Sequence, residues 1–325
     1  MLFLFLAFAS GNTYSRYSSN PNSGCSDSLA SCYPVIPRPQ HIRYGNREIS
    51  FSDFHLVSNR GAAENEMLIQ FLSEQGLVSR ANGFPFRFEL DSESWENRPE
   101  GYALTISDSE VLLSAGNSKG FFYGIQTLKQ LFRQNTGFGY LPEVQITDWP
   151  AFPIRGFMHD TGRNYQPLAQ LKEQIEWLAR YKYNVFHWHL TDNPGWRLES
   201  KIYPELQSDA AFSREVGKFY SQSELLELLQ FCEDRHITLI PEFDIPGHTE
   251  AFRRAFGLER MDDPRVGPIL KGLIQELLDL ANADRLPFIH MGTDEVRNES
   301  ERVDSAVLNE IKVYLEQRGR SVLVW

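Results

Sequence analysis

The stretch FIHMGTDEV, residues 288–296, joins a short apolar run to two adjacent carboxylates, Asp294 and Glu295. The apolar run is typical of a buried strand, which places both carboxylates at its carboxyl end. Neighbouring residues of a regular strand face opposite ways, so both acids reach one pocket only if the chain bends there. Such a pair suits glycoside chemistry, in which one acid protonates the leaving oxygen and a negative charge supports a cationic sugar. A solvated strand exit is the alternative that this stretch alone leaves open.

The chain around this stretch repeats a short strand, a loop and a helix from Ile154 onward. Repeated units of this kind predict a parallel sheet with right-handed crossovers. One helix opens with Ser221-Gln222-Ser223-Glu224, a capping box that satisfies free amide groups. The expected strands are 155–159, 184–190, 238–243, 288–292 and 321–325, and the expected helices lie near 168–181, 222–235, 265–281 and 302–318.

Charged residues gather directly after the expected strands, at positions that line the catalytic face of a (β/α) barrel. A closed barrel needs eight strands, but five are visible and the chain stops inside the fifth at Trp325. We therefore expect an α/β protein with an incomplete (β/α)8 TIM-barrel catalytic domain, about five of eight strands being present, in a chain truncated at its carboxyl end. The residues that follow the strands are Asp160, Asp192, Asp244, His248, Asp294 and Glu295.

Residues 35–149 show a mixed pattern that predicts a small α+β domain before the barrel. Residues 102–106 alternate like a half-buried strand, and 110–113 read as its partner across an Asp-Ser turn. Apolar residues then recur at helical spacing in 121–132, and a second helix is expected over 63–75. Asp148-Trp149-Pro150 is the expected boundary with the barrel domain, residues 150–325, because proline discourages continuation of regular structure.

The first 34 residues are predicted to be a signal segment and linker. Residues 1–9 have the length of a signal-peptide core and end in the small-x-small form of a cleavage site, although no Lys or Arg precedes them. A buried amino-terminal strand is the alternative. Export predicts a secreted or extracytoplasmic location, where Cys25 and Cys32 could close a small disulfide loop. Cys232, which continues a leucine stripe, is expected to be a buried hydrophobe.

Composition excludes several classes of protein. The formal net charge is −11 and no run of Lys or Arg stands out, which argues against a nucleic-acid partner. No apolar stretch approaches the roughly 20 residues that span a bilayer. Aromatic residues make up 13% of the chain and include six tryptophans, which argues against disorder and favours a ligand that stacks on flat rings.

Two further motifs carry polar side chains on expected strands. Arg155 stands at the start of the first strand, where it could form a structural ion pair or bind sugar hydroxyls with its planar donors. His187 and His189 share one side of the next strand, as metal ligands would, but a polar layer in a barrel core is an equally good interpretation. Pro246-Gly247 forms a turn that presents His248 just beyond its strand.

Four ordered blocks together identify a family resemblance. They are Arg155-Gly156 with Asp160 and Arg163, the block His-Trp-His-Leu-Thr-Asp at 187–192, the block Pro-Glu-Phe-Asp-Ile-Pro-Gly-His at 241–248, and the block His-Met-Gly-Thr-Asp-Glu-Val at 290–296. From Arg155 to Trp325 the chain resembles glycoside hydrolase family 20, the β-N-acetylhexosaminidases. The preceding segment looks like that family's small amino-terminal domain, so the resemblance covers about nine tenths of the chain. Four long blocks in order are far more specific than one.

The resemblance implies a role for each matching position. Glu295 matches the general acid/base, and Asp294 matches the residue that orients and polarises the substrate's 2-acetamido group. Arg155 matches the clamp on the far hydroxyls of the sugar, and Trp325 matches the first aromatic wall of the acetamido pocket. Asp192 and His248 match a supporting network around the acid.

The activity that the resemblance implies is the removal of terminal non-reducing N-acetylhexosamine from β-linked glycans or chitooligosaccharides, with retention of configuration and without cofactor or metal. The implied mechanism is substrate-assisted, because in this family the amide oxygen of the sugar attacks in place of an enzyme carboxylate. The resemblance does not separate GlcNAc from GalNAc substrates, nor does it give an oligomeric state.

Two departures and three alternatives accompany this interpretation. Thr293 stands where the family often has glycine, and the residues that the family takes from strands six to eight are absent. A non-catalytic carbohydrate-binding protein and a metal-dependent hydrolase using His187 and His189 remain alternatives. Ser118, in a Gly-Asn-Ser-Lys-Gly stretch, fits the nucleophile elbow of a serine esterase, although the strand before it reads as half of a hairpin.

Overall fold

The computed structural model describes residues 28–58, 62–296 and 298–325. Most of the predicted signal segment and linker, including Cys25, lies outside these residues. The chain divides into two compact units. One holds the described residues up to Glu89 together with 103–113 and 128–147, and the other holds 90–102, 114–127 and 148–325.

The strands of the first part of the chain form one mixed sheet in the order β1-β8-β5-β6-β4-β2-β3, with β7 paired to β8. Buried residues alternate with half-buried ones along β5 and β6, which confirms the predicted half-buried strands. This sheet, with the helices over 29–32 and 62–74, forms the predicted small α+β domain, whereas residues 118–127 of the helix after β6 fall in the second unit. The elements are α1 (Leu29–Cys32), β1 (His41–Phe51), β2 (Asp53–Ser58), α2 (Ala62–Glu74), β3 (Val78–Ser79), β4 (Phe84–Leu90), β5 (Tyr102–Ile106), β6 (Val111–Ala115), α3 (Ser118–Leu131), β7 (Arg133–Asn135) and β8 (Phe138–Asp148).

Two segments that precede residue 148 belong to the second unit, and buried hydrogen bonds show why. The hydroxyl of Tyr102 lies 2.5 Å from the hydroxyl of Thr127 and donates to Asp148 over 3.0 Å. Lys182 adds its ammonium to the same carboxylate at 2.8 Å. A buried polar group must keep its partners, so these four residues stay together.

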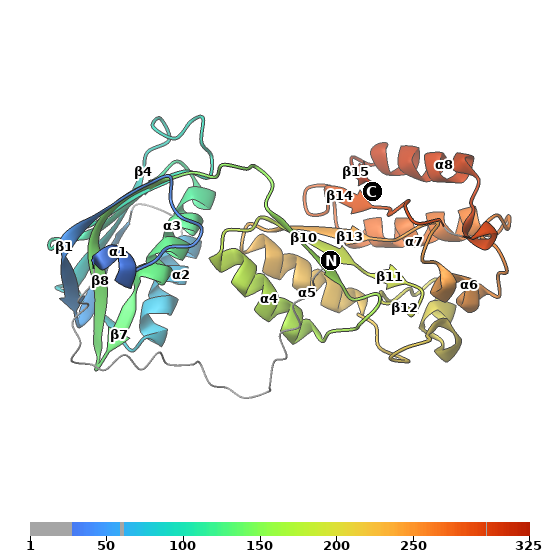
Figure 1. Cartoon of the computed structure of the whole chain (residues 1–325), viewed down its shortest axis with the longest axis horizontal. Helices are drawn as coiled ribbons and strands as arrows, with labels where there is room; N and C mark the ends of the chain where they lie inside the picture. The colour runs from blue at the N-terminus through green and yellow to red at the C-terminus, as the bar shows by residue number, and fades with distance from the viewer. Residues whose placement is uncertain (1–27, 59–61, 297) are drawn as a thin grey trace. The chain divides into compact units, whose positions relative to one another are not determined.

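The second unit contains a five-stranded parallel sheet in the order β15-β14-β13-β10-β9. The helices between the strands lie alongside this sheet (Figure 1). The predicted strands and helices are confirmed, and they form an incomplete (β/α)8 barrel. The elements are β9 (Gly156–Asp160), α4 (Leu168–Arg180), β10 (Val185–His189), α5 (Gln222–Glu233), β13 (Thr238–Glu242), α7 (Val266–Leu280), β14 (Phe288–His290), α8 (Ser305–Glu316) and β15 (Ser321–Leu323).

The loops of this unit contain shorter elements. The sequence did not predict α6 (Glu250–Phe256), whose seven residues are too few to show a clear helical period. The others are the hairpin β11 (Thr191–Asp192) with β12 (Gly195–Trp196), and the 3₁₀ turns η1 (Pro204–Gln207), η2 (Asp209–Ala211) and η3 (Glu299–Glu301).

Local sequence explains how helix α5 begins. The capping box predicted at Ser221 is present, with the Ser221 hydroxyl accepting from the Glu224 amide and the Glu224 carboxylate accepting in return from the Ser221 amide. Cys232 on α5 is a buried free thiol, as expected, whereas Cys32 is disulfide-bonded. No helix in the described ranges has the length and apolar character required to cross a membrane.

Strand register aligns the carboxyl ends of the parallel sheet. Asp160 pairs with His189, His189 with Glu242, Glu242 with His290, and His290 with Leu323. The polar residues that follow each strand therefore start from one row, which is the condition for a shared site at this edge.

Candidate active site

A series of alternating acidic and imidazole groups runs across the strand ends. The buried carboxylate of Asp192 has its Oδ2 atom 3.1 Å from His189 Nε2 and 3.6 Å from His248 Nδ1. His248 Nε2 in turn lies 2.9 Å from Glu295 Oε2. The structure thus brings together Asp192, His248 and Glu295, three of the residues that the sequence predicted for the site.

The acidic pair stands on a sharply bent segment after β14. Gly292, Thr293 and Glu295 all have positive φ, at 65°, 84° and 50°. A positive φ is uncommon for any residue with a side chain and is strained for a β-branched one, and such strain concentrates at functional sites. The bend that the sequence required is therefore present, and Thr293 takes part in it. Asp294 is half-buried and Glu295 is exposed.

Glycines allow the loops of this region to approach closely. A Cβ atom on Gly247 would lie 2.7 Å from the backbone oxygen of Asp294, so the turn before His248 packs directly against the acidic pair. A Cβ atom on Gly292 would lie 1.9 Å from Oδ1 of Asp244. The loops after β13 and β14 are consequently in close contact.

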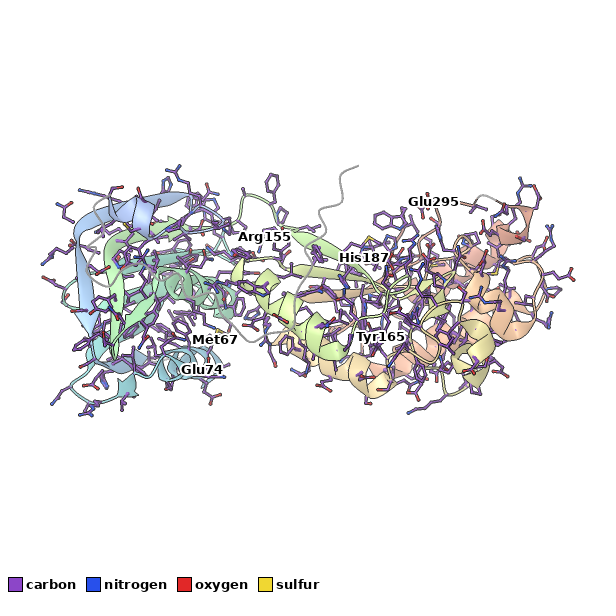
Figure 2. The ribbon with its side chains drawn as sticks, turned by 60° about the horizontal axis from the view of Figure 1, so that its bottom comes forward. Met67, Glu74, Arg155, Tyr165, His187 and Glu295 are labelled. Carbon is purple, nitrogen blue, oxygen red and sulfur yellow. The ribbon has the colours of Figure 1, made fainter. Side chains whose placement is uncertain are left out.

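The structure does not bring Arg155 into this group. Arg155 precedes β9, whereas the site residues follow the strand ends, and a strand of five residues spans about 16 Å. Figure 2 shows Arg155 apart from His187 and Glu295. Its guanidinium is committed to Glu100 at 2.6 Å and to the backbone oxygens of Phe152 and Lys182. These contacts match the structural ion pair that the sequence left open, rather than the sugar clamp.

Arg163 occupies the site instead. It follows the carboxyl end of β9 in the block Asp-Thr-Gly-Arg, and its Nη2 atom lies 3.0 Å from Asp192 Oδ2. Its Nη1 atom donates to Asp160 over 2.7 Å. The side chain is 42% exposed, so part of its planar donor set faces outward.

Trp325 joins the site from the segment after β15. Its indole Nε1–H donates to Glu242 Oε1 over 3.0 Å, and its backbone amide donates to the oxygen of Gly292 over 2.9 Å. Its ring centroid lies 4.7 Å from that of His290 and 5.4 Å from that of His187. The predicted aromatic residue therefore lies beside the strand ends and remains 56% exposed.

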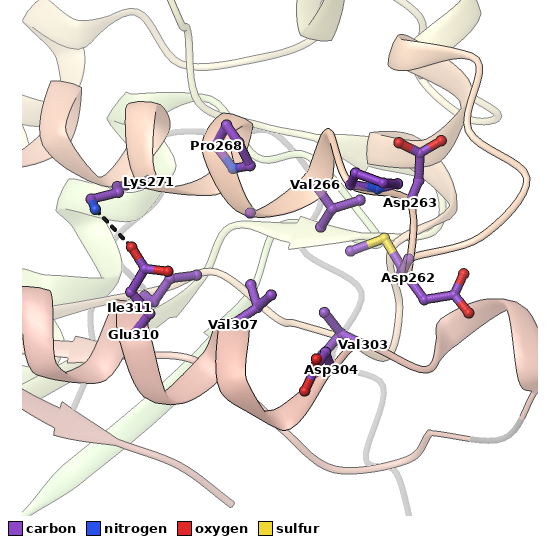
Figure 3. Close-up of a pocket in the computed structure, with 13 residues that line it drawn as sticks. Asp262, Asp263, Val266, Pro268, Lys271, Val303, Asp304, Val307, Glu310 and Ile311 are labelled. Atoms are coloured by element: carbon purple, nitrogen blue, oxygen red, sulfur yellow. Dashed lines mark hydrogen bonds and ion pairs between the residues drawn. The ribbon is translucent and has the colours of Figure 1, made fainter.

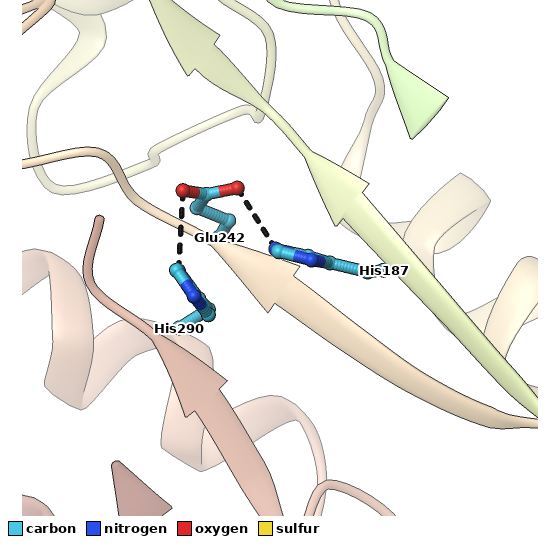
Figure 4. A group of neighbouring side chains, drawn as sticks. All are labelled: His187, Glu242 and His290. Atoms are coloured by element: carbon cyan, nitrogen blue, oxygen red, sulfur yellow. Dashed lines mark ion pairs between the residues drawn. The ribbon is translucent and has the colours of Figure 1, made fainter. Parts of the chain in front are cut away.

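Glu242 is a buried carboxylate for which the sequence indicated no role. Its carboxylate is fully buried and is flanked by His187 and His290, as Figure 4 shows. Oε2 lies 2.8 Å from His187 Nε2 and 2.9 Å from His189 Nδ1, and Oε1 lies 3.1 Å from His290 Nδ1. In the sequence, this residue could be recognised as a charged residue at the end of an otherwise apolar strand.

Among the described residues, three groups of donor atoms are close enough together to raise the question of a metal. They are His187 with Glu242 and His290, His189 with Glu242 and Asp244, and Asp192 with Asp244 and His248. In the first of them the Glu242 oxygens lie 2.8 Å from His187 Nε2 and 3.1 Å from His290 Nδ1. Tetrahedral ligands about 2.0–2.1 Å from zinc lie roughly 3.3 Å apart. The atoms of this group therefore lie closer to one another than the ligands of a zinc ion would.

Burial and charge pairing have opposite effects on the pKa values of these groups. Burial alone would raise the pKa of Glu242 and of Asp192, but contacts with imidazoles outweigh it and hold both pKa values well below their usual range. Burial alone would lower the pKa of His189, but Asp192 and Glu242 raise it to about 10. The carboxylates and His189 are therefore charged at neutral pH.

The pKa values of the groups next to the acidic pair are also shifted. The contact with the Asp192 carboxylate is the main cause that raises the pKa of His248 to about 9. Burial, with the nearby charges of Glu242 and Asp294, raises the pKa of Asp244 to about 7. An imidazolium at position 248 thus faces Glu295 at neutral pH.

A surface cavity of about 430 Å³ lies elsewhere, between α7 and α8 (Figure 3). Its lining includes Val266, Val307 and Ile311, and an ion pair between Lys271 and Glu310 borders it. None of the predicted site residues lines this cavity. Its location on the helices separates it from the chemistry at the strand ends.

The fold is an incomplete (β/α)8 barrel, and the cluster places carboxylates and imidazoles at the carboxyl ends of its strands. The description "Glycosyl hydrolase family 20, catalytic domain" matches residues 152–262, and "Glycosyl hydrolase family 20, domain 2" matches residues 32–149. The chain belongs to glycosyl hydrolase family 20. The catalytic-domain match ends before Asp294, Glu295 and Trp325.

Individual relatives agree with this assignment. A beta-hexosaminidase of Vibrio furnissii is 34% identical over 227 residues, which cover 60% of this chain and 37% of the relative. A beta-hexosaminidase of Akkermansia muciniphila is 41% identical over 167 residues, which cover 48% of this chain and 34% of the relative. The crystal structure of a GH20 exo beta-N-acetylglucosaminidase from Vibrio harveyi in complex with N-acetylglucosamine superposes with a TM-score of 0.75 at 27% identity, covering 92% of this chain and 55% of that one. The chain spans about a third of these curated relatives and just over half of the solved structure.

Proposed function

We propose that the protein is a β-N-acetylhexosaminidase, which removes terminal non-reducing N-acetylhexosamine from β-linked glycans by a retaining, substrate-assisted mechanism. One observation carries the proposal. The acid-bearing segment presents Asp294 and Glu295 from one bend, and Glu295 is linked through His248 to the buried carboxylate of Asp192. Membership of glycosyl hydrolase family 20 and the beta-hexosaminidase relatives support the same reaction.

In the first step the amide oxygen of the substrate's 2-acetamido group attacks the anomeric carbon. The glycosidic bond breaks, and Glu295 gives its proton to the departing oxygen. The sugar becomes a cyclic oxazolinium ion, whose positive charge is spread over the former amide. An ionised Asp294 beside that amide stabilises the developing charge.

In the second step water attacks the anomeric carbon and opens the oxazolinium ring. Glu295, now a carboxylate, accepts a proton from that water and returns to its starting form. Two inversions at one carbon leave the configuration retained. The role of His248 is to orient Glu295 and supply a positive charge beside it in the carboxylate stage, which the 2.9 Å contact supports.

Two further residues belong to the proposed binding site. Arg163, partly exposed and held by Asp160 and Asp192, takes the role of binding sugar hydroxyls that the sequence had given to Arg155. Trp325 offers an exposed indole face, on which the apolar methyl of the acetamido group can pack.

A secreted or extracytoplasmic location is also part of the proposal. It is supported by the disulfide of Cys32, because disulfides persist in oxidising compartments, and by the apolar stretch of residues 1–9.

The decisive experiment compares hydrolysis of an aryl N-acetyl-β-glucosaminide with that of the matching aryl β-glucoside. We expect strong preference for the acetamido sugar, because glucose lacks the internal nucleophile. Equal rates would contradict the substrate-assisted mechanism. Glycan binding without release of the aryl group would favour a carbohydrate-binding protein instead.

A further inference from the structure

Glu242 is a buried carboxylate to which the reaction proposed above gives no task. It ends β13, the central strand of the five-stranded sheet, and its side chain is fully buried. Strand register sets it between His189 of β10 and His290 of β14. A lone carboxylate in this position would be very costly, so its surroundings must supply positive charge or donors.

Four side-chain nitrogens from three neighbouring segments meet this carboxylate. His187 and His189 of β10 approach Oε2 at 2.8 Å and 2.9 Å, while His290 of β14 approaches Oε1 at 3.1 Å. The fourth is the indole nitrogen of Trp325, which donates to Oε1 over 3.0 Å. His189, whose pKa is raised to about 10 by its contacts with Asp192 and Glu242, compensates the charge, and the indole supplies a directed hydrogen bond.

The indole of Trp325 is largely exposed, although its N–H donates to a buried carboxylate. The residue is 56% exposed, yet its N–H points inward to a carboxylate that solvent does not reach. Its backbone amide is tied to Gly292, on the bend that carries the acidic pair. The ring therefore has one fixed edge and one free face.

The carboxylate of Glu242 is connected through contacts with the series of acidic and imidazole groups that ends at Glu295. His189 contacts Glu242 through Nδ1 and Asp192 through Nε2, and Asp192 contacts His248, which faces Glu295. These buried polar residues are not required for stability alone. Apolar residues of similar volume would stabilise the fold as well as buried ion pairs do, or better.

We propose that Glu242 is a positioning residue, whose ionised carboxylate fixes the indole of Trp325 in the orientation that receives the acetamido group of the sugar. The assignment of that sugar rests on the proposed function. His187, His189 and His290 keep the carboxylate ionised in its buried place. The aromatic wall and the acid–base series consequently share one anchor.

A double-mutant cycle tests this coupling through binding of N-acetylglucosamine, with Kd measured by calorimetry. Glu242→Gln removes the charge with little change of shape, and Trp325→Phe removes the indole N–H while it keeps an aromatic ring. We expect Glu242→Gln to weaken binding at least about fivefold in the wild-type background and less than about twofold in the Trp325→Phe background. Equal weakening in both backgrounds would overturn the proposal, because Glu242 would then act without Trp325.

The indole signal of Trp325 gives a second readout that does not depend on any sugar. It is assigned in a ¹H–¹⁵N correlation spectrum as the signal that Trp325→Phe deletes. We expect Glu242→Gln to shift it upfield, because a hydrogen bond to a carboxylate is stronger than one to an amide. Asp148→Asn, which neutralises another buried carboxylate of an ion pair, is the matched control and should leave the signal in place.

The two readouts separate the two proposals. If the wild-type protein fails to bind N-acetylglucosamine, the proposed function is contradicted, and the indole signal still decides the role of Glu242. If Glu242→Gln leaves the indole signal unshifted, the positioning role is contradicted whatever the protein binds.

Discussion

At the scale of single residues, Glu295 and Asp192 occupy very different environments within one connected series of side chains. Glu295 is exposed at the end of that series, whereas Asp192 is buried and ion-paired. The imidazole of His248 lies between them. In the proposed mechanism, this arrangement separates the residue that exchanges protons from the residue that holds it in place.

Glu295→Gln should lower kcat on an aryl N-acetylglucosaminide by at least about a hundredfold, because an amide cannot donate or accept the required proton. Binding of N-acetylglucosamine should change by less than about threefold, since the shape of the side chain is kept. Kinetics and calorimetry on the same preparation measure both. Glu299→Gln, at an exposed glutamate four residues away, is the control and should leave both quantities unchanged. A Glu295→Gln variant with near wild-type kcat would rule out Glu295 as the acid.

Asp192→Asn should lower the pKa of His248, since the contact with Asp192 is the main cause that raises it from 6.5 to about 9. We expect the midpoint to fall by at least about one unit in an NMR titration of the imidazole. Because the folded-state pKa is raised, this contact stabilises the protein fully below pH 6.5, and the stabilisation is lost as pH rises to about 9. Urea unfolding at pH 6 and at pH 9.5 should show a smaller difference in the variant. Asp284→Asn, at an exposed carboxylate, should not move the His248 midpoint.

At the scale of elements, the segment after β14 concentrates the unusual backbone of the site. Gly292, Thr293 and Glu295 have positive φ, and Gly292 is in close contact with Asp244 of the neighbouring loop. A regular strand exit could not direct two consecutive carboxylates toward one region. The departure from regular geometry is thus what makes the acidic pair usable.

Gly292→Ala should destabilise the protein more than an ordinary glycine substitution. Its Cβ atom would lie 1.9 Å from Asp244 Oδ1, in addition to the strain of a residue held at φ 65°. Gly257→Ala is the matched control, because Gly257 has φ 59° and its added Cβ would meet nothing within 4 Å. We expect the control to cost about 1–2 kcal/mol and Gly292→Ala at least about 2 kcal/mol more, measured by urea unfolding. Equal losses in the two variants would show that the contact with Asp244 is unimportant.

At the scale of the whole molecule, five strand ends contribute to one site. Arg163 follows β9, His189 and Asp192 belong to β10 and its loop, Glu242 and His248 to β13 and its loop, Glu295 follows β14, and Trp325 follows β15. These residues are far apart along the chain, and parallel register brings them together.

Chelation should leave this site intact, because its histidines and carboxylates pair directly with one another at 2.8–3.1 Å. We expect EDTA to change neither the turnover of an aryl N-acetylglucosaminide nor the Tm of the protein, relative to EDTA presaturated with magnesium. A loss of either that zinc restores would identify a metal site at His187, Glu242 and His290.

The sequence by itself determined the order and type of the main elements, because apolar periodicity and capping are local properties. The parallel strands, the four main helices of the barrel and the capping box at Ser221 follow from that information. It also placed the acidic pair at a strand end and required the bend that the structure shows.

Only the tertiary structure decided which polar residues share a site. Arg155 and Arg163 stand in one sequence block, and nothing local distinguishes them, but five residues of extended strand carry them to opposite ends of β9. Glu242 was likewise visible only as a polar residue in an apolar strand, since its partners come from β10, β14 and the segment after β15. Contacts between distant strands depend on register and packing, and these are properties of the folded chain rather than of any stretch of it.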